Sequence, residues 1–326
     1  MYNWLSFVSL ISITSIGKWP AVMVSTTQKL DVSELKVHFY DFQSGIKITN
    51  KIDDAFDGIV NNVNLDLQRH LNIYIPGYRS NSDDSPETAL RQALKDVPNI
   101  YLIVFDYSYY SAKRLTKESL EKTMPYIFDL GTAMGKFVAR LHELVFKADK
   151  IRGFGHSAGG QLVGVMGEAF KNTTGNKIAR ITSIDPAKQC FSEHLETHTR
   201  SGQAEFVEVI HCESQNYGSL SNHADADIYY NKEDAVYPGC YDSNKNKVRN
   251  LGEVDMVTCA HIFCVQEYMR TVSQPKWFKA CADYDDYVKH GCANSDIVYS
   301  GYYHNNTSKG IFYASTKVGP RVVPIA

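Results

Sequence analysis

The sequence lacks several features that would point to particular functions. Its formal net charge is only −2 and it has no strongly basic run, so nucleic-acid binding is not expected. The apolar run at the N-terminus is shorter than the about 20 residues that span a membrane. No internal repeat, low-complexity tract or linker divides the 326 residues. Cysteine is absent before position 190, and all seven cysteines lie from there on.

The N-terminal apolar run is instead typical of a secretory signal peptide. We predict this signal at residues 1–20, with residues 21–326 forming one domain; a buried N-terminal segment is the alternative. Glycosylation acceptors at Asn172, Asn305 and Asn306 agree with secretion. The odd cysteine count leaves at least one thiol free or paired outside the chain.

Apolar segments with strand and helix patterns alternate along the chain. Strand patterns occupy residues 32–42, 71–75, 99–105, 150–154, 179–184 and 205–210, and helical spacing occupies residues 88–94, 126–145 and 161–171. This alternation predicts an α/β fold with a mostly parallel, doubly wound sheet and flanking helices. The chain after about residue 273 is richer in Tyr, Asn, Asp and Lys, which indicates loops or edge structure.

Polar residues and glycines follow several of the predicted strands. The active site of such a sheet lies beyond the carboxyl ends of its strands. The residues at these ends, which we therefore expect to cluster, are Gly77, Asp106, Ser157, Asp185 and His211.

The segment from Gly155 to Gly159 reads Gly-His-Ser-Ala-Gly and matches the G-x-S-x-G pattern between a predicted strand and a predicted helix. A nucleophilic serine at this turn needs strained backbone, and strand and helix pass so closely that the flanking positions require glycine. Ser157 is thus the candidate nucleophile. The alternative is a glycine-rich turn with a capping serine.

A serine nucleophile needs a base and an orienting carboxylate, which follow it in the order acid, then histidine, in α/β-hydrolases. Asp185 is the first acid at a strand end after Ser157, although an aspartate before proline can also simply cap a turn. His211 ends a strand, and His261 opens an amphipathic helix beside cysteines. The residues alone favour His261 only slightly.

The oxyanion formed during ester cleavage needs two backbone N–H donors. One would come from Ala158, directly after the candidate nucleophile, and the other from Tyr78 in the loop after an earlier strand. A plain β-turn is the alternative reading of the Pro-Gly-Tyr sequence that ends at Tyr78.

From about residue 37 to residue 272 the chain resembles the pancreatic-lipase family, most closely its single-domain insect branch of lipases and phospholipases A1. The motifs that carry the resemblance lie at residues 74–78, 104–107, 155–159, 184–187, 206–211, 227–231, 237–240 and 259–261. The resemblance implies an α/β-hydrolase fold and makes His261 the match to the catalytic base. It also implies a lid disulfide between Cys240 and Cys259 and a second disulfide between Cys281 and Cys292, and leaves Cys190, Cys212 and Cys264 unassigned.

The chain also departs from the family. The family usually has leucine where Ala158 stands and histidine where Pro76 stands. The acidic residues that hold structural calcium in vertebrate relatives are not evident, so we predict no metal and no cofactor. Too few residues follow His261 for the relatives' C-terminal β-sandwich domain.

The resemblance implies a secreted serine ester hydrolase that cleaves acyl esters of phospholipids, as a phospholipase A1, or of glycerides, through an acyl-enzyme. Its substrate would lie at a membrane or lipid-droplet surface. The lid at residues 241–258 is rich in Lys, Arg and Asn, which suits a phospholipid head group, although it could equally be a solvated loop. The alternatives are an inactive, yolk-protein-like lipid-binding protein and a general carboxylesterase. The sequence indicates no oligomeric state.

Overall fold

The computed structural model describes residues 29–78, 80, 85–111, 126–188, 198–212, 217–232, 256–274, 279–303 and 307–316. The predicted signal peptide, residues 241–255 of the predicted lid, and the residues Cys190, Cys240, Asn305 and Asn306 lie outside this description.

Within the described residues, eleven strands form one sheet, in the order β10-β9-β11-β8-β7-β6-β5-β3-β4-β1-β2. The strands that carry the candidate site and its flank are β3 (His70–Ile75), β4 (Ile100–Asp106), β5 (Ile151–His156), β6 (Arg180–Ile184), β7 (Phe206–His211) and β8 (Ala226–Tyr230). The outer strands are β1 (Lys36–Asp41), β2 (Ile46–Lys51), β9 (Lys279–Cys281), β10 (Val298–Tyr299) and β11 (Gly310–Ala314).

The central sheet is parallel, as the sequence predicts. Every neighbouring pair from β11 across to β4 runs parallel, whereas β1 and β2 at one edge and β9 and β10 at the other pair antiparallel. The predicted α/β-hydrolase class, with a mostly parallel sheet, is confirmed. The strands β3, β5, β6 and β7 are parallel neighbours, so their carboxyl ends lie side by side along the same end of the sheet.

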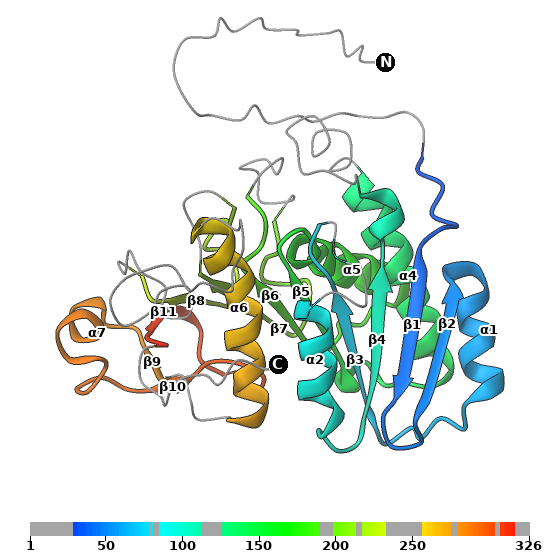
Figure 1. Ribbon diagram of the computed structural model, residues 1–326, viewed down its shortest axis with the longest axis horizontal. Coiled ribbons are helices and arrows are strands. Elements are labelled where there is room, and N and C mark those ends of the chain that lie inside the picture. Colours follow the sequence, from blue (N-terminus) through cyan, green and yellow to red (C-terminus); the bar gives the residue numbers. More distant parts are fainter. Residues whose placement is uncertain are drawn as a thin grey trace, which may run out of the picture.

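Helices cover both faces of the sheet (Figure 1). On one face pack α1 (Ile52–Asn62), α4 (Ile127–Leu144) and α5 (Ala158–Thr174); on the other pack α2 (Ser85–Lys95) and α6 (Met256–Ser273). Strand β4 is apolar on both faces. Ile103 and Phe105 pack against the layer of α1, α4 and α5, and Leu102 packs against the layer of α2 and α6. A strand buried on both faces reads as a continuous apolar run, as the sequence of β4 does.

Short elements complete the chain: the 3-10 turns η1 (Ser108–Tyr110) and η3 (Ala148–Lys150), and α7 (Tyr284–His290) near β9 and β11. The sequence patterns gave no expectation for β2, α1 or β8. The region after residue 273, expected as loops or edge structure, includes β9, β10 and β11, which extend the sheet beyond β8.

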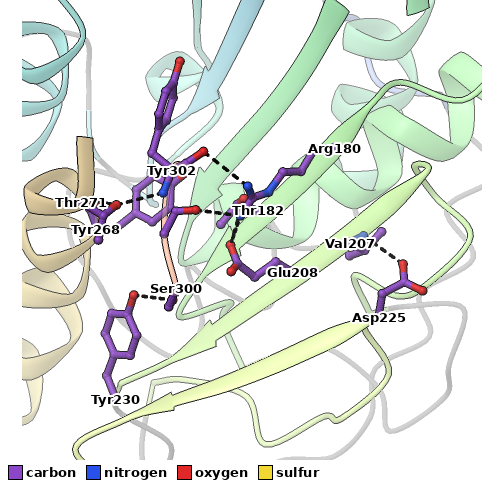
Figure 2. Close-up of polar contacts among 11 residues, drawn as sticks. Arg180, Thr182, Val207, Glu208, Asp225, Tyr230, Tyr268, Thr271, Ser300 and Tyr302 are labelled. Atoms are coloured by element: carbon purple, nitrogen blue, oxygen red, sulfur yellow. Dashed lines mark hydrogen bonds and ion pairs between the residues drawn. The ribbon is translucent and has the colours of Figure 1, made fainter. Parts of the chain in front are cut away.

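A buried polar network fastens the C-terminal part of the chain to the sheet (Figure 2). The guanidinium of Arg180, at the start of β6, pairs with Glu208 and donates to the carbonyl of Gly301 at 2.9 Å. The next residue, Tyr302, donates its backbone N–H to the hydroxyl of Thr271 in α6 at 2.9 Å. The last turns of α6 are thus tied to the sheet through the segment that carries residues 300–302.

Candidate active site

Ser157 occupies a sharp turn between β5 and α5. Its backbone has φ 57° and ψ −121°, a conformation that is strained for a residue with a side chain. A Cβ on Gly155 would lie 2.1 Å from the carbonyl oxygen of Gly159, and a Cβ on Gly159 would lie 2.1 Å from that of Ile75. Only glycine fits at either position, so the local sequence is the one that this turn requires.

Asp185 directly follows β6 and is fully buried, with a positive φ of 45°. The ends of neighbouring strands are joined here by backbone hydrogen bonds. Ser157 donates its N–H to the carbonyl of Ile184 at 3.0 Å, and Asp185 donates its own to the carbonyl of Ile210 at 2.7 Å. These bonds fix the relative positions of the ends of β5, β6 and β7.

Two donors from the described part of the chain contact the carboxylate of Asp185. Nδ1 of His261 lies 2.6 Å from its Oδ2, and the backbone N–H of Cys212 donates to its Oδ1 at 2.8 Å. An imidazole that donates from Nδ1 keeps the lone pair of its neutral form on Nε2, where it can accept a proton. The hydrogen bond between His261 and Asp185 therefore runs in the direction that a general base needs.

His261 does not open its helix, as the sequence suggested, because α6 already begins at Met256. The histidine lies in the second turn and is 7% exposed. Its ring lies beside that of His156, with centroids 4.7 Å apart, and beside that of Tyr217, at 5.6 Å. Since His156 immediately precedes Ser157, this contact brings α6 to the nucleophile turn.

His156 is a second histidine of the site, and the sequence patterns gave it no role. Burial, together with the neighbouring His261, holds the pKa of His156 well below its usual value. The ring is therefore neutral, and its Nε2 donates to the carbonyl oxygen of His261 at 3.0 Å. A histidine beside the serine of a G-x-S-x-G turn is a signal for this contact, but the sequence does not say what it touches.

His211, the other candidate base, pairs with Asp227 and not with Asp185. Its Nε2 lies 2.9 Å from Oδ1 of Asp227, and its Nδ1 lies 2.8 Å from the carbonyl oxygen of Ser219. Its ring stacks on Tyr229, with centroids 4.5 Å apart. Both ring nitrogens thus face groups other than Asp185, so the structure brings His261, and not His211, to the candidate acid.

The loop after β3 lies against the nucleophile turn. A Cβ on Gly77 would lie 3.4 Å from Cβ of Ser157 and 3.1 Å from Nδ1 of His156. The hydroxyl of Tyr107, which is fully buried, donates to the carbonyl of Pro76 at 3.1 Å. This contact, which sequence reasoning missed, holds the loop whose next residues are expected to supply an oxyanion donor.

The two candidate oxyanion donors come from the two sides of the site. Ala158, buried, is the first residue of α5, and Tyr78 is a half-buried residue of the loop after β3. The N–H groups at the start of a helix have no partner within the helix, so that of Ala158 suits a developing anion. Asp106, at the end of β4, lies 3.6 Å from His38 of β1, measured between Oδ2 and Nε2.

Two disulfides lie wholly within the described residues. Cys281 bonds to Cys292, as the family resemblance implies. Cys212 bonds to Cys264, and the sequence analysis assigned neither of these two cysteines a partner. Cys259 is disulfide-bonded too, and its expected partner lies outside the described part. Among the described residues, no three His, Cys, Asp or Glu side chains gather as metal ligands would.

Asn172, the one predicted glycosylation acceptor among the described residues, is exposed near the end of α5. None of the helices in the described ranges combines the length and apolar character needed to cross a bilayer.

Comparison with known proteins identifies the family of this chain. The model of the Lipase family matches residues 16–312. The chain belongs to the Lipase family. Membership covers most of the sequence and includes the turn at Ser157, the strand end at Asp185 and the helix at His261.

Individual lipases are distant relatives. Pancreatic lipase-related protein 2 of Bos taurus is 25% identical over 70% of this chain and 50% of that protein. Pancreatic triacylglycerol lipase of Myocastor coypus is 24% identical over 74% of this chain and 54% of its own length. The chain thus spans about half the length of the curated relatives that it matches.

Solved structures give weaker matches. Est1E from Butyrivibrio proteoclasticus is 20% identical over 38% of this chain and 43% of its own, with a TM-score of 0.25. A phospholipase/carboxylesterase from Dyadobacter fermentans is 14% identical over 46% of this chain and 68% of its own, with a TM-score of 0.33.

Proposed function

We propose that this protein is a serine ester hydrolase in which Ser157, His261 and Asp185 form the catalytic triad. The observation that carries the proposal is the 2.6 Å contact between Nδ1 of His261 and Oδ2 of Asp185. His261 lies in α6, the helix that contacts His156 beside the strained turn of Ser157. The three residues come from distant parts of the chain. The bond from Ser157 to Ile184, next to Asp185, and the contact between His156 and His261 support the proposal that they act together.

In the proposed reaction, the hydroxyl oxygen of Ser157 attacks the ester carbonyl while Nε2 of His261 takes the hydroxyl proton. Asp185 stabilises the resulting imidazolium through Nδ1–H. The N–H groups of Ala158 and Tyr78 bind the oxyanion. When the intermediate collapses, the imidazolium gives its proton to the leaving alcohol. Water then attacks the acyl-enzyme by the same route and releases the fatty acid.

We propose acyl esters of lipids as the substrates, either phospholipids, cleaved as by a phospholipase A1, or glycerides. The named relatives, a pancreatic triacylglycerol lipase and pancreatic lipase-related proteins, support the lipid class. Secretion fits the disulfides Cys212–Cys264 and Cys281–Cys292, since disulfides persist in oxidising compartments. Exposure of Asn172 is compatible with a glycan at that residue.

The test compares wild-type protein with Ser157→Ala on dispersed phosphatidylcholine, phosphatidylserine and triacylglycerol and on a short-chain soluble ester. We expect Ser157→Ala to abolish hydrolysis while its circular dichroism spectrum stays unchanged, and a fluorophosphonate probe to label only the wild type. Positional analysis of the released fatty acid then separates attack at sn-1 from attack at sn-2.

Undiminished turnover by Ser157→Ala would rule out the proposed catalytic triad. If the wild-type protein binds lipid but neither hydrolyses an ester nor reacts with the probe, a lipid-binding role would replace catalysis. Hydrolysis of the soluble ester alone would indicate a general carboxylesterase.

A further inference from the structure

The disulfide between Cys212 and Cys264 lies beside both partners of the Asp185–His261 pair. On one side, the backbone N–H of Cys212 donates to Oδ1 of Asp185 at 2.8 Å. On the other, Cys264 is three residues after His261 in α6, so it belongs to the following turn of the same helix. Residues at this spacing lie on the same side of a helix.

These contacts close a ring through the site. It runs from Asp185 to the backbone of Cys212, across the S–S bond to Cys264, back one turn along α6 to His261, and through Nδ1 to Asp185. The cross-link joins residues 52 positions apart in sequence, with the two Cα atoms 5.8 Å apart. It therefore attaches the helix that carries the proposed base to the residue after β7, whose backbone N–H holds the proposed acid.

Helix α6 is also anchored by its packing on the sheet and, near its start, by the disulfide of Cys259. Tyr268 and Val272 pack in the core of their face, and Thr271 accepts from the backbone of Tyr302 at 2.9 Å. The turn at His261 is held by the contacts with Asp185 and His156 and by the disulfide of Cys259, two residues before His261. The Cys212–Cys264 bond adds a cross-link from this part of α6 to the residue whose N–H holds Asp185.

We propose that Cys212 and Cys264 are positioning residues whose disulfide sets the orientation of His261 relative to Asp185. This inference rests on the proposed triad. The bond acts on two groups at once: it fixes the N–H that orients the carboxylate and the helix turn that carries the imidazole. Displacements of about 1 Å in a catalytic constellation can lower rates by roughly 10²-fold.

The chain provides a matched control. The Cys281–Cys292 disulfide also joins buried cysteines, but in β9 and just after α7. Replacing it removes an S–S bond without touching either partner of the Asp185–His261 pair. The experiment compares Cys212→Ala/Cys264→Ala with Cys281→Ala/Cys292→Ala at a temperature where circular dichroism shows both folded. If the first variant does not fold, Cys212→Val/Cys264→Ala, which refills part of the lost volume, replaces it.

Two measurements are made on each variant. The first is kcat and KM on a soluble ester. We expect kcat of the Cys212/Cys264 variant to fall by roughly tenfold to 100-fold with KM nearly unchanged, because substrate contacts are retained and only the base is misaligned. The control variant should keep both constants. Equal kcat values in the two variants would overturn the proposal.

The second measurement is the ¹⁵N chemical shifts of the His261 ring at alkaline pH, which show which ring nitrogen carries the proton. In wild type and control we expect Nδ1 to carry it, and in the Cys212/Cys264 variant we expect a mixture of tautomers. This readout needs no turnover. If Ser157→Ala leaves hydrolysis intact, the proposed function fails, yet a tautomer change confined to the Cys212/Cys264 variant would still support positioning, and an unchanged tautomer would reject it.

Discussion

Replacing Asp185 by asparagine tests the polarity of the site atom by atom. In the wild type, Oδ1 accepts the N–H of Cys212 and Oδ2 accepts Nδ1–H of His261. Asparagine offers one oxygen and one NH₂ group to these two positions. If its oxygen faced His261, its NH₂ would face the N–H of Cys212, and two buried donors would meet, at a cost of about 1–3 kcal/mol.

The amide should therefore turn its oxygen to Cys212 and its NH₂ to Nδ1 of His261. Nδ1 must then accept, so the ring proton moves to Nε2, and Nε2 can no longer take the proton of Ser157. In Ser-His-Asp enzymes an Asp→Asn change of this kind lowers kcat by about 10⁴-fold. That factor corresponds to about 5 kcal/mol of transition-state stabilisation.

The assay is steady-state hydrolysis of a soluble ester, with Asp227→Asn as the matched control. Asp227 pairs with His211 at 2.9 Å in a second buried carboxylate–histidine contact nearby. We expect Asp227→Asn to lower thermal stability and to leave kcat within a few-fold of wild type. The reasoning fails if Asp185→Asn keeps kcat within tenfold of wild type, or if Asp227→Asn proves the more damaging change.

Two other contacts give testable outcomes. Tyr107→Phe removes the donor to Pro76 and should lower kcat by roughly tenfold, because the oxyanion loop is held less firmly. The control is Tyr101→Phe, which should keep kcat, since the Tyr101 hydroxyl accepts from Asp66 away from the site. Equal kcat values in the two variants would argue against a role for the Tyr107 contact. Because the pKa of His156 is lowered in the folded protein, the unfolded chain takes up a proton at this residue at a higher pH than the folded protein does. The free energy of unfolding should therefore fall as pH drops below about 6.5. Between pH 5 and pH 8, the melting temperature of a folded His156→Gln variant should depend less steeply on pH than that of the wild type, and an equally steep dependence would contradict the assignment.

The sequence predicts the central sheet because its signals there are local. The run of β4 is apolar throughout, and the helix over Ile127–Leu144 repeats apolar residues at helical spacing. The turn at Ser157 is predictable for the same reason, since close approach of backbone demands glycine at Gly155 and Gly159. Steric constraints among a few adjacent residues are sufficient to predict the turn that carries the candidate nucleophile.

The contacts around the nucleophile are not local, and the sequence could not give them. Nothing near His211 shows that Asp227 and Ser219 occupy its ring nitrogens, so the choice of base depended on family resemblance. The pairing of Cys212 with Cys264 spans 52 positions and depends on how α6 packs on the sheet. Such information exists only once the strand order is set.

The strand order also explains how a rigid site arises from separate loops. Each strand end is bonded to the next: Ser157 to the carbonyl of Ile184, Asp185 to that of Ile210, and the N–H of Cys212 to the carboxylate of Asp185. A shift of one strand end would break a buried hydrogen bond to its neighbour. The serine turn and the acid thus move as one body with the sheet. Of the three proposed catalytic residues, only His261 lies within a helix, so the attachment of that helix to Cys212 would contribute most to preorganisation.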